Sequence, residues 1–558
     1  MVDYFRALKT IVQSPKSRVS DVRWLETLPQ GDYLAAQDVV LAKLEEFLQE
    51  GVSLEQSALD ALFLIDEHQR PTLEALTNQY VHATSLAHEI DDRLWHSVTR
   101  YYTLLARLYR RFLDRCQEAP DSLPHDLPQL VLNVMDCQRC VVKWRYFRHQ
   151  SVEPGVWLQL HQVYAIAEQE GCEAAPIWRH RNLGETTITS TYLQLMMLGT
   201  LSSSDMLKHE VEMVVGWMAD WCAPLVLNRE FVPSRHLFYV RLTEDKPGRR
   251  ARKLENQNDC RFWDTDQLES RMAKAHVEMQ QGKVPADLRL TSGARVSDCQ
   301  PLLEYLLTEW SRTGYQRQRR ADARRETSRT SHIVDGLENV CQHVKSLAYA
   351  RRKGRASKTS TPQPGQLFSN STFLQIDDGE TPQVLSAGRW TFTNESNHGY
   401  GAIVDAGQNP WLRLGRLIAF FGDREHHVPV VGVVRNIKHL QDDRRYVGIE
   451  VLSRRVVQVT LRNLDQQPPS WNPAKTDIFL ASTLVQDGGF PFSALYLPKD
   501  EERNMPPTLL IPTLEYVPNA TFELRSDPYV YRIRFGRLIE QRDDWVCVEA
   551  RMLEKSEG

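Results

Sequence analysis

The spacing of apolar residues changes along this chain, and that change limits the possible folds more than any other feature. In residues 94–116, large apolar side chains recur at intervals of three and four, which predicts a helix with one buried face. These side chains are Leu94, Trp95, Val98, Tyr101, Tyr102, Leu105, Leu108, Tyr109 and Phe112. Residues 34–49, 54–69 and 191–201 have the same spacing, so we expect the first 310 residues to be all-α.

Beyond residue 328 the apolar residues alternate instead. In residues 444–453, Val447, Ile449 and Val451 point one way and the residues between them the other, as in a half-buried strand. The other segments that we expect to be strands are 328–340, 388–396, 416–422, 428–437 and 456–464. Short strands separated by turns predict a small antiparallel β-barrel.

Two further segments differ from this barrel. Residues 350–366 are basic, rich in Ser and Thr and contain Pro, which predicts a mobile insertion of about 342–386 that folding does not require. Residues 521–525, 529–540 and 545–553 alternate again. They predict a second small β domain, either a companion barrel or a protein-docking module, to which we assign no ligand.

The fold class that follows is α+β multidomain, with an all-α region followed by two barrel-like β domains. A chain of 558 residues is too long for one hydrophobic core. We place the helical region at 1–310, the first barrel at 311–466 and the second β domain at 467–558. Proline-containing breaks suggest two helical subdomains, and residues 237–245 predict a lone strand within the helical region.

Several classes of protein are excluded by what the chain lacks. The nine cysteines are scattered and odd in number, as expected for a reduced cytoplasmic protein, and we read Cys137 and Cys140 as two thiols on one helix. The densest apolar segment, 211–227, is interrupted by Glu212 and Asp220 and is short for a membrane span. No nucleophile–base pair or group of metal ligands is readable, so we expect neither an enzyme nor a transmembrane segment.

Arginines are concentrated in residues 318–329, although the net charge of the chain is −4. They are Arg319, Arg320, Arg324, Arg325 and Arg329. Three interpretations are open: a solvated helix face, a nucleic-acid patch, or half of a pocket for a small, doubly anionic ligand. The basic run is short and no wider basic surface accompanies it, which makes nucleic acid an unlikely partner.

The order of motifs around this run resembles a PilZ domain. Arg319-Arg320-x-x-x-Arg324 precedes a predicted strand, Asn394-x-Ser396-x-x-Gly399 follows, and a later strand contains Val-Gly-Ile-Glu. The resemblance covers residues 315–465, about a quarter of the chain. PilZ domains bind the bacterial second messenger cyclic di-GMP, so the resemblance implies this ligand.

The resemblance also implies a set of site residues. They are Arg319, Arg320, Arg324 and Arg325 before the barrel, and Asn394, Ser396 and Gly399 on it. A guanidinium group can pair in a bidentate manner with a phosphate or with O6 and N7 of guanine. Gly399 would allow a close backbone approach or a positive φ. Arg325 and Arg329 have the same spacing as Arg320 and Arg324. We favour Arg320 and Arg324 as the binding pair, but the register of the arginine motif is open.

The function we expect is that of a cytoplasmic bacterial receptor for cyclic di-GMP. The ligand would order residues 312–329 and change how the helical region packs, which would pass the signal to an unidentified protein partner. The alternative is a protein-interaction scaffold whose barrels bind no nucleotide.

Overall fold

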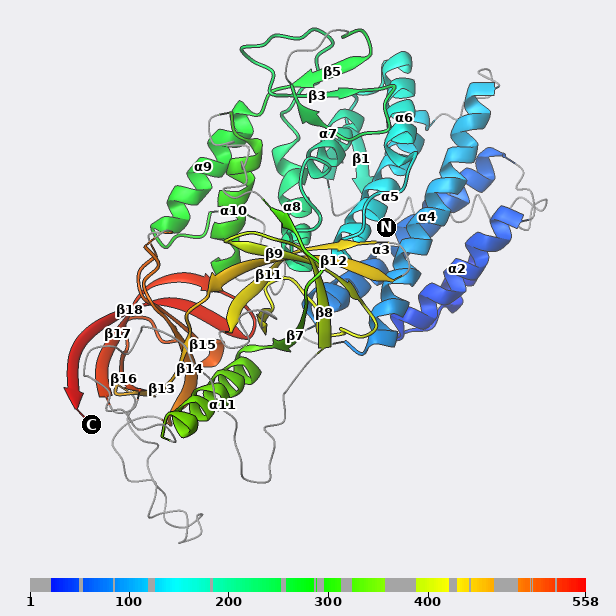
Figure 1. Ribbon diagram of the computed structural model, residues 1–558. Coiled ribbons are helices and arrows are strands. Elements are labelled where there is room, and N and C mark those ends of the chain that lie inside the picture. Colours follow the sequence, from blue (N-terminus) through cyan, green and yellow to red (C-terminus); the bar gives the residue numbers. More distant parts are fainter. Residues whose placement is uncertain are drawn as a thin grey trace. The chain divides into compact units, whose positions relative to one another are not determined.

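The structure is a computed structural model, and it divides the chain into two compact units, Met1–Arg319 and Arg320–Gly558. The residues that it describes are 22–49, 54–83, 86–118, 126–180, 184–251, 257–285, 288, 296–312, 324–356, 388–420, 429–440, 443–465, 490–501, 503, 505–526 and 529–557. The first unit is mainly helical and the second mainly β (Figure 1). The expected fold class, a helical region followed by two small β-barrels, is confirmed.

The first unit is built from helices that share one apolar core. The described helices are η2 (Arg23–Thr27), α2 (Tyr33–Gln49), α3 (Gln56–His82), α4 (His88–Glu118), α5 (Leu127–Phe147), α6 (Val156–Glu170), α7 (Ile188–Leu198), α8 (Lys208–Trp221), α9 (Asp266–Gln280) and α10 (Val296–Trp310). The predicted apolar face of α4 is buried along its whole length, as the spacing of three and four requires. No helix in the described ranges is both long and apolar enough to cross a bilayer.

The strands of the first unit differ from the expectation. The predicted lone strand is β3 (Phe238–Arg241), and it is the centre of a three-stranded sheet between β4 (Arg249–Arg250) and β5 (Cys260–Trp263). The hairpin of β1 (Ile177–His180) and β2 (Gly184–Thr186) was not predicted either. The four strands that were not predicted, β1, β2, β4 and β5, have two to four residues, which is too short for an alternating pattern to be recognised.

The two thiols of the Cys-x-x-Cys segment lie on α5, as expected. Cys137 and Cys140 are both buried, and burial raises the pKa of Cys137 well above its usual value. In the described part of the chain no group of three or more potential ligands could hold a metal ion. These cysteines therefore pack as small apolar side chains.

The first barrel is antiparallel. Its strands are β6 (Arg325–Glu326), β7 (Thr330–Asp335), β8 (Gly388–Glu395), β9 (Gly399–Asp405), β10 (Leu417–Phe420), β11 (Val430–His439) and β12 (Arg444–Ser453). Their order is β6-β8-β7-β10-β11-β12-β9, and a pairing of β8 with β9 closes the sheet. Strands β6 and β7 follow each other along the other edge of β8. Val447, Ile449 and Val451 are buried, which confirms the predicted alternation in β12.

The second barrel is closed and also antiparallel. Its strands are β13 (Val457–Asn463), β14 (Phe492–Leu497), β15 (Thr508–Pro512), β16 (Thr521–Ser526), β17 (Tyr529–Gln541) and β18 (Trp545–Glu557). The sequence placed β13 in the first barrel, but it pairs with β14 and β16 of the second. An alternating pattern shows which residues of a strand face the core, but it does not show which strand lies next to it.

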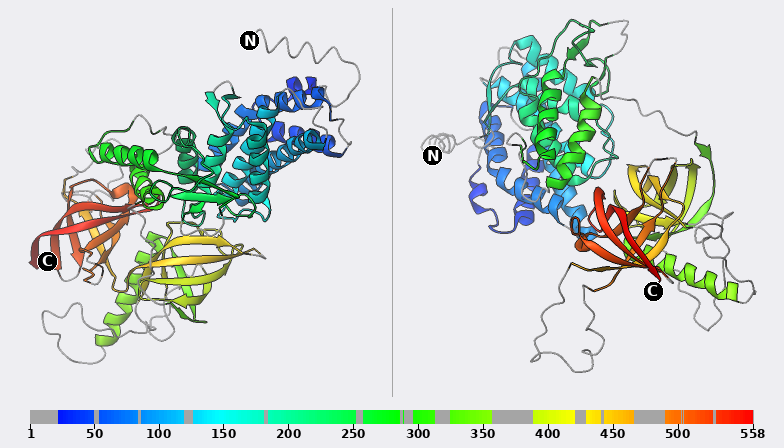
Figure 2. Two further views of the ribbon diagram at one scale, coloured as in Figure 1. Left: turned by 90° about the horizontal axis from the view of Figure 1, so that it is seen from above. Right: turned by 90° about the vertical axis from the view of Figure 1, so that its left-hand side faces the viewer.

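A helix packs against both barrels at the position where the sequence predicted the start of a mobile insertion. Residues 342–356 belong to α11 (Leu337–Ala356), so the prediction is wrong for this part, while residues 357–387 lie outside the described ranges. Figure 2 shows α11 running alongside both barrels. One core cluster contains Val334, Leu337, Val340, Cys341, Val344, Leu417, Ala419, Val431, Val433, Leu495, Leu497, Leu510, Trp545 and Cys547. The barrels therefore share apolar packing with α11 and form one body.

Ion pairs add to this contact between the barrels. Arg435 on β11 donates to both carboxylate oxygens of Glu540 on β17 and also, at 2.7 Å, to Glu450 on β12. Arg416 before β10 donates to Asp335 and, at 2.6 Å, to Asp544 after β17. Each guanidinium thus bridges carboxylates of the two barrels, which orients one barrel on the other.

Candidate functional site

The predicted site residues lie where the chain enters the first barrel and where β8 turns into β9. Arg319 and Arg320 lie outside the described residues. Strand β6 pairs with β8, which sets Arg325 opposite Glu395 and Glu326 opposite Asn394. The arginine-containing segment therefore runs along the edge of β8, beside the Asn-x-Ser-x-x-Gly motif.

Arg324 and Asn394 meet at a third side chain, Tyr446 on β12. Arg324 Nη1 donates to Tyr446 Oη at 3.0 Å, and Asn394 Nδ2 donates to the same oxygen at 3.4 Å. Asn394 Nδ2 also lies 3.3 Å from Thr393 Oγ1, to which it donates. Asn394 Oδ1 is buried and has no hydrogen-bond partner in the described part of the chain. A polar cluster on the barrel wall thus contains a buried acceptor that has no partner among the described residues.

A glycine makes room for this cluster. Gly401 on β9 lies opposite Asn394 on β8 and opposite Gly448 on β12. A Cβ atom at Gly401 would overlap Tyr446 Oη and would lie 2.6 Å from Asn394 Nδ2. Any other residue would push both side chains away, so the approach of Asn394 to Tyr446 requires glycine here.

The turn between β8 and β9 is held together by its own hydrogen bonds. The Ser396 backbone N–H donates to the Gly399 carbonyl at 2.8 Å, and Ser396 Oγ donates to the same oxygen at 3.3 Å. Arg454 donates to the carbonyls of Ser396 at 3.3 Å and Asn397 at 3.1 Å, and to Tyr400 Oη at 2.8 Å. Arg454 therefore fixes the turn that carries the predicted serine.

Gly399 is needed for packing within the barrel. A Cβ atom there would lie 2.9 Å from the carbonyl oxygen of Ile449 on the neighbouring β12. The sequence predicted either a positive φ or a close backbone approach at Gly399. Its φ is not positive, so the close backbone approach is the reason for glycine here. The approaching group is a strand of the same barrel.

The two arginines of the alternative register have different surroundings. Arg325 is exposed at the start of β6. Arg329 is half-buried, its Nη1 lies 3.8 Å from Glu395 Oε2, and its carbonyl accepts a hydrogen bond from the Phe392 N–H at 2.7 Å. Arg324, from the preferred register, reaches the Asn394 cluster. The choice of register stays a prediction, because Arg320 is outside the described residues.

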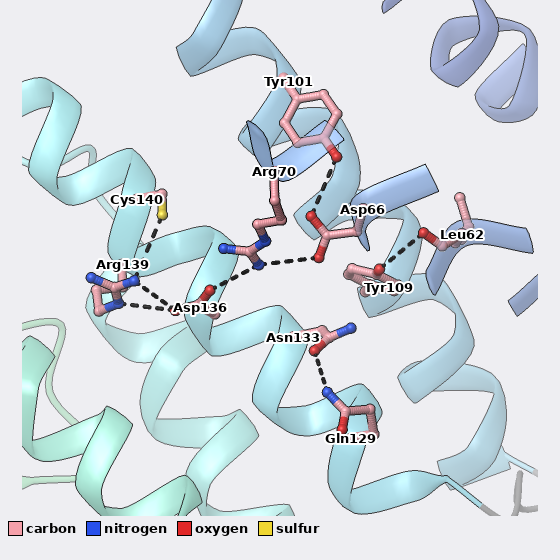
Figure 3. Close-up of polar contacts among 10 residues, drawn as sticks. All are labelled: Leu62, Asp66, Arg70, Tyr101, Tyr109, Gln129, Asn133, Asp136, Arg139 and Cys140. Carbon is pink, nitrogen blue, oxygen red and sulfur yellow. Dashed lines mark hydrogen bonds and ion pairs between the residues drawn. The ribbon is translucent and has the colours of Figure 1, made fainter. Parts of the chain in front are cut away.

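The helical unit contains a buried group of charged residues that could be mistaken for a second site (Figure 3). Arg70 Nη2 donates to Asp66 at 3.3 Å and to Asp136 at 3.1 Å, and Arg139 donates to Asp136 at 2.8 Å. Tyr101 donates to Asp66 at 3.3 Å, and burial raises the pKa of Tyr101 well above its usual value. Two carboxylates balance two guanidinium groups, so the network joins α3, α4 and α5 and leaves no net charge for a ligand.

Comparison with known proteins gives one family match. Residues 20–230 match the family model described as "Cyclic-di-GMP receptor FimW, N-terminal domain". The match includes α2 to α8 with the network of Figure 3, and it ends before the barrel that contains Arg324. No curated protein and no solved structure matches the chain. The helical region, which no motif identified from sequence, is therefore similar to part of a receptor family.

Three residues around the site were not found from sequence. Tyr446 and Arg454 lie on or after β12, more than fifty residues from Asn394 and Ser396, and no local spacing connects them. Gly401 had a weak signal, because it follows Gly399 with one residue between them. The pairing of β8, β9 and β12 brings all three residues to the motif, and this pairing cannot be read from the sequence.

Proposed function

We propose that this protein is a cytoplasmic bacterial receptor for cyclic di-GMP, without catalytic activity, that binds the nucleotide on its first barrel. The observation that carries the proposal is the match of residues 20–230 to a family described as the N-terminal domain of a cyclic di-GMP receptor. The PilZ-like motifs lie in a different part of the chain, so they support the same ligand independently.

The chemistry of the barrel cluster fits such a ligand. Cyclic di-GMP carries two phosphates and two guanines. Arg324 is exposed and uses one N–H for Tyr446, so its other N–H groups are available for a phosphate or for the O6 and N7 acceptors of guanine. Asn394 holds the Tyr446 oxygen through Nδ2, and a contact of its enclosed Oδ1 with a guanine N–H would require the amide to turn outward. In this proposal Arg319, Arg320 and Arg325 supply further guanidinium contacts to the ligand, while Ser396 and Gly399 shape the turn between β8 and β9.

The proposed signal passes through the segment that connects the two units. The boundary between the units falls between Arg319 and Arg320, inside the arginine motif. The two barrels and α11 share one core, so the second unit responds as a single body. Residues 325–329 already pair with β8. The proposed ordering by ligand therefore applies to the part of 312–329 that precedes them, and this change would alter how the helical unit presents itself to a protein partner.

One observation favours the alternative function of a scaffold that binds no nucleotide. Ser396 Oγ and Gly399 both make contacts inside the barrel, so a purely structural reason for the motif exists. A receptor and a scaffold differ in ligand response. The free energy of ligand binding adds to stability, so micromolar binding at a hundredfold excess over Kd stabilises the folded chain by about 2.7 kcal/mol.

Thermal unfolding of the full chain tests the proposal directly. We expect cyclic di-GMP to raise the melting temperature, whereas GTP and cyclic di-AMP at the same concentration should not. Equal curves with and without cyclic di-GMP would favour the scaffold. Equal shifts with all three nucleotides would indicate a general anion effect.

A further inference from the structure

Tyr446 lies at the centre of the polar cluster on the first barrel. Its hydroxyl oxygen accepts one hydrogen bond from Arg324 and another from Asn394. The phenol has one proton to donate, and in the described part of the chain no acceptor for it is found. The tyrosine is half-buried, so its ring is fixed on the barrel while its hydroxyl reaches the surface group Arg324.

We propose that Tyr446 is a ligand-contacting residue that also positions Arg324 and Asn394 for cyclic di-GMP; this inference rests on the proposed function. Arg324 and Tyr446 together present guanidinium N–H donors and a phenol O–H donor, while Asn394 holds the Tyr446 oxygen from the barrel side. The O6 and N7 atoms of guanine are the complementary acceptors.

Gly401 gives this inference independent support. A side chain at Gly401 would occupy the position of the Tyr446 hydroxyl and of the Asn394 amide. The space over Gly401 is therefore filled by the two polar groups where they meet. A tyrosine with a purely apolar role would use its ring for packing and would need no space at its oxygen.

The arrangement also explains how an exposed arginine can be selective. A free arginine side chain loses rotamer freedom when it binds. The hydrogen bond from Arg324 Nη1 to Tyr446 restricts the guanidinium before the ligand arrives, so less freedom is lost on binding. Tyr446 should thus act partly through Arg324 and partly through its own proton.

The test is a double-mutant cycle on the full chain, with cyclic di-GMP affinity measured by titration calorimetry. We expect Tyr446→Phe to weaken binding about tenfold, as for the loss of a hydrogen bond at a site that needs it. Arg324→Ala should weaken binding more. The double variant should lose less than the sum of the two single losses, because the residues act together. Tyr531→Phe on β17 is the matched control and should bind as the parent does.

The outcomes separate this inference from the function on which it rests. No binding by the parent would overturn the proposed function and this inference with it. Binding by the parent, loss in Arg324→Ala and no change in Tyr446→Phe would overturn the inference alone. An early melting transition of Tyr446→Phe, with affinity unchanged at a temperature where it is folded, would show that the hydroxyl serves only stability.

Discussion

Val340→Ala in α11 should destabilise the two barrels together. Val340 is fully buried in the core cluster that joins α11 to both barrels. The substitution removes two methyl groups, worth about 0.8 kcal/mol each in transfer free energy, and leaves a cavity that adds to the loss. Alanine has a higher helix propensity than valine, which returns about half a kcal/mol. The net cost is therefore about 2 kcal/mol.

The expected effect can be measured by thermal unfolding of the full chain. In a unit of this size, each kcal/mol shifts the melting temperature by about 2–4 °C, so the transition of the second unit should fall by roughly 4–8 °C. Hydrogen exchange should show faster exchange in α11, β10 and β15, since they border the same cluster.

Lys345→Ala is the matched control, because Lys345 lies on the same helix and is exposed. It should melt within experimental error of the parent. If Val340→Ala also melts like the parent, and exchange in β10 and β15 is unchanged, α11 does not pack between the barrels. The interpretation of the second unit as one body would then be wrong.

Two more predictions concern charge and register. The ion pairs with Arg435 and Arg542 hold the pKa of Glu540 below its usual value, so their stabilisation is present above the ordinary glutamate pKa and is lost as pH falls through the depressed one. Glu540→Gln should therefore lower stability at pH 7 by about 1–3 kcal/mol and flatten the acid limb of a urea-melt series, and an unchanged acid limb would refute this. Arg329→Ala should leave cyclic di-GMP affinity nearly unchanged if Arg324 belongs to the binding pair; a loss as large as that of Arg324→Ala in calorimetry would favour the other register.

Long amphipathic helices were predictable, because their pattern repeats over many turns. The apolar residues of α4 alone indicate one buried face over some twenty residues. The same signal exists in α11, where Leu337, Val340, Cys341 and Val344 follow the spacing of i, i+3, i+4 and i+7. The composition of residues 350–366 predicts an insertion that begins at about residue 342, and this predicted start falls within the packed helix.

Contacts between distant strands were not predictable from local patterns. The alternation in β13 is clear, yet it does not show that the partners of β13 lie in the second barrel. Likewise, the motif residue Asn394 was predicted, whereas its partner Tyr446 was not. The hydrogen bond between them exists because β8, β9 and β12 are neighbours in a closed sheet, and that neighbourhood depends on topology.

Calorimetric titration of the full chain with cyclic di-GMP, in parallel with Arg324→Ala, tests the central claim most directly. The account predicts that the parent binds with a Kd of about 1 micromolar or below, and that the variant binds roughly five- to a hundredfold more weakly through loss of a charge-assisted contact. The variant should melt like the parent, because Arg324 is exposed. Absence of heat with the parent at about a hundred micromolar ligand, or equal affinity of parent and variant, would contradict the account.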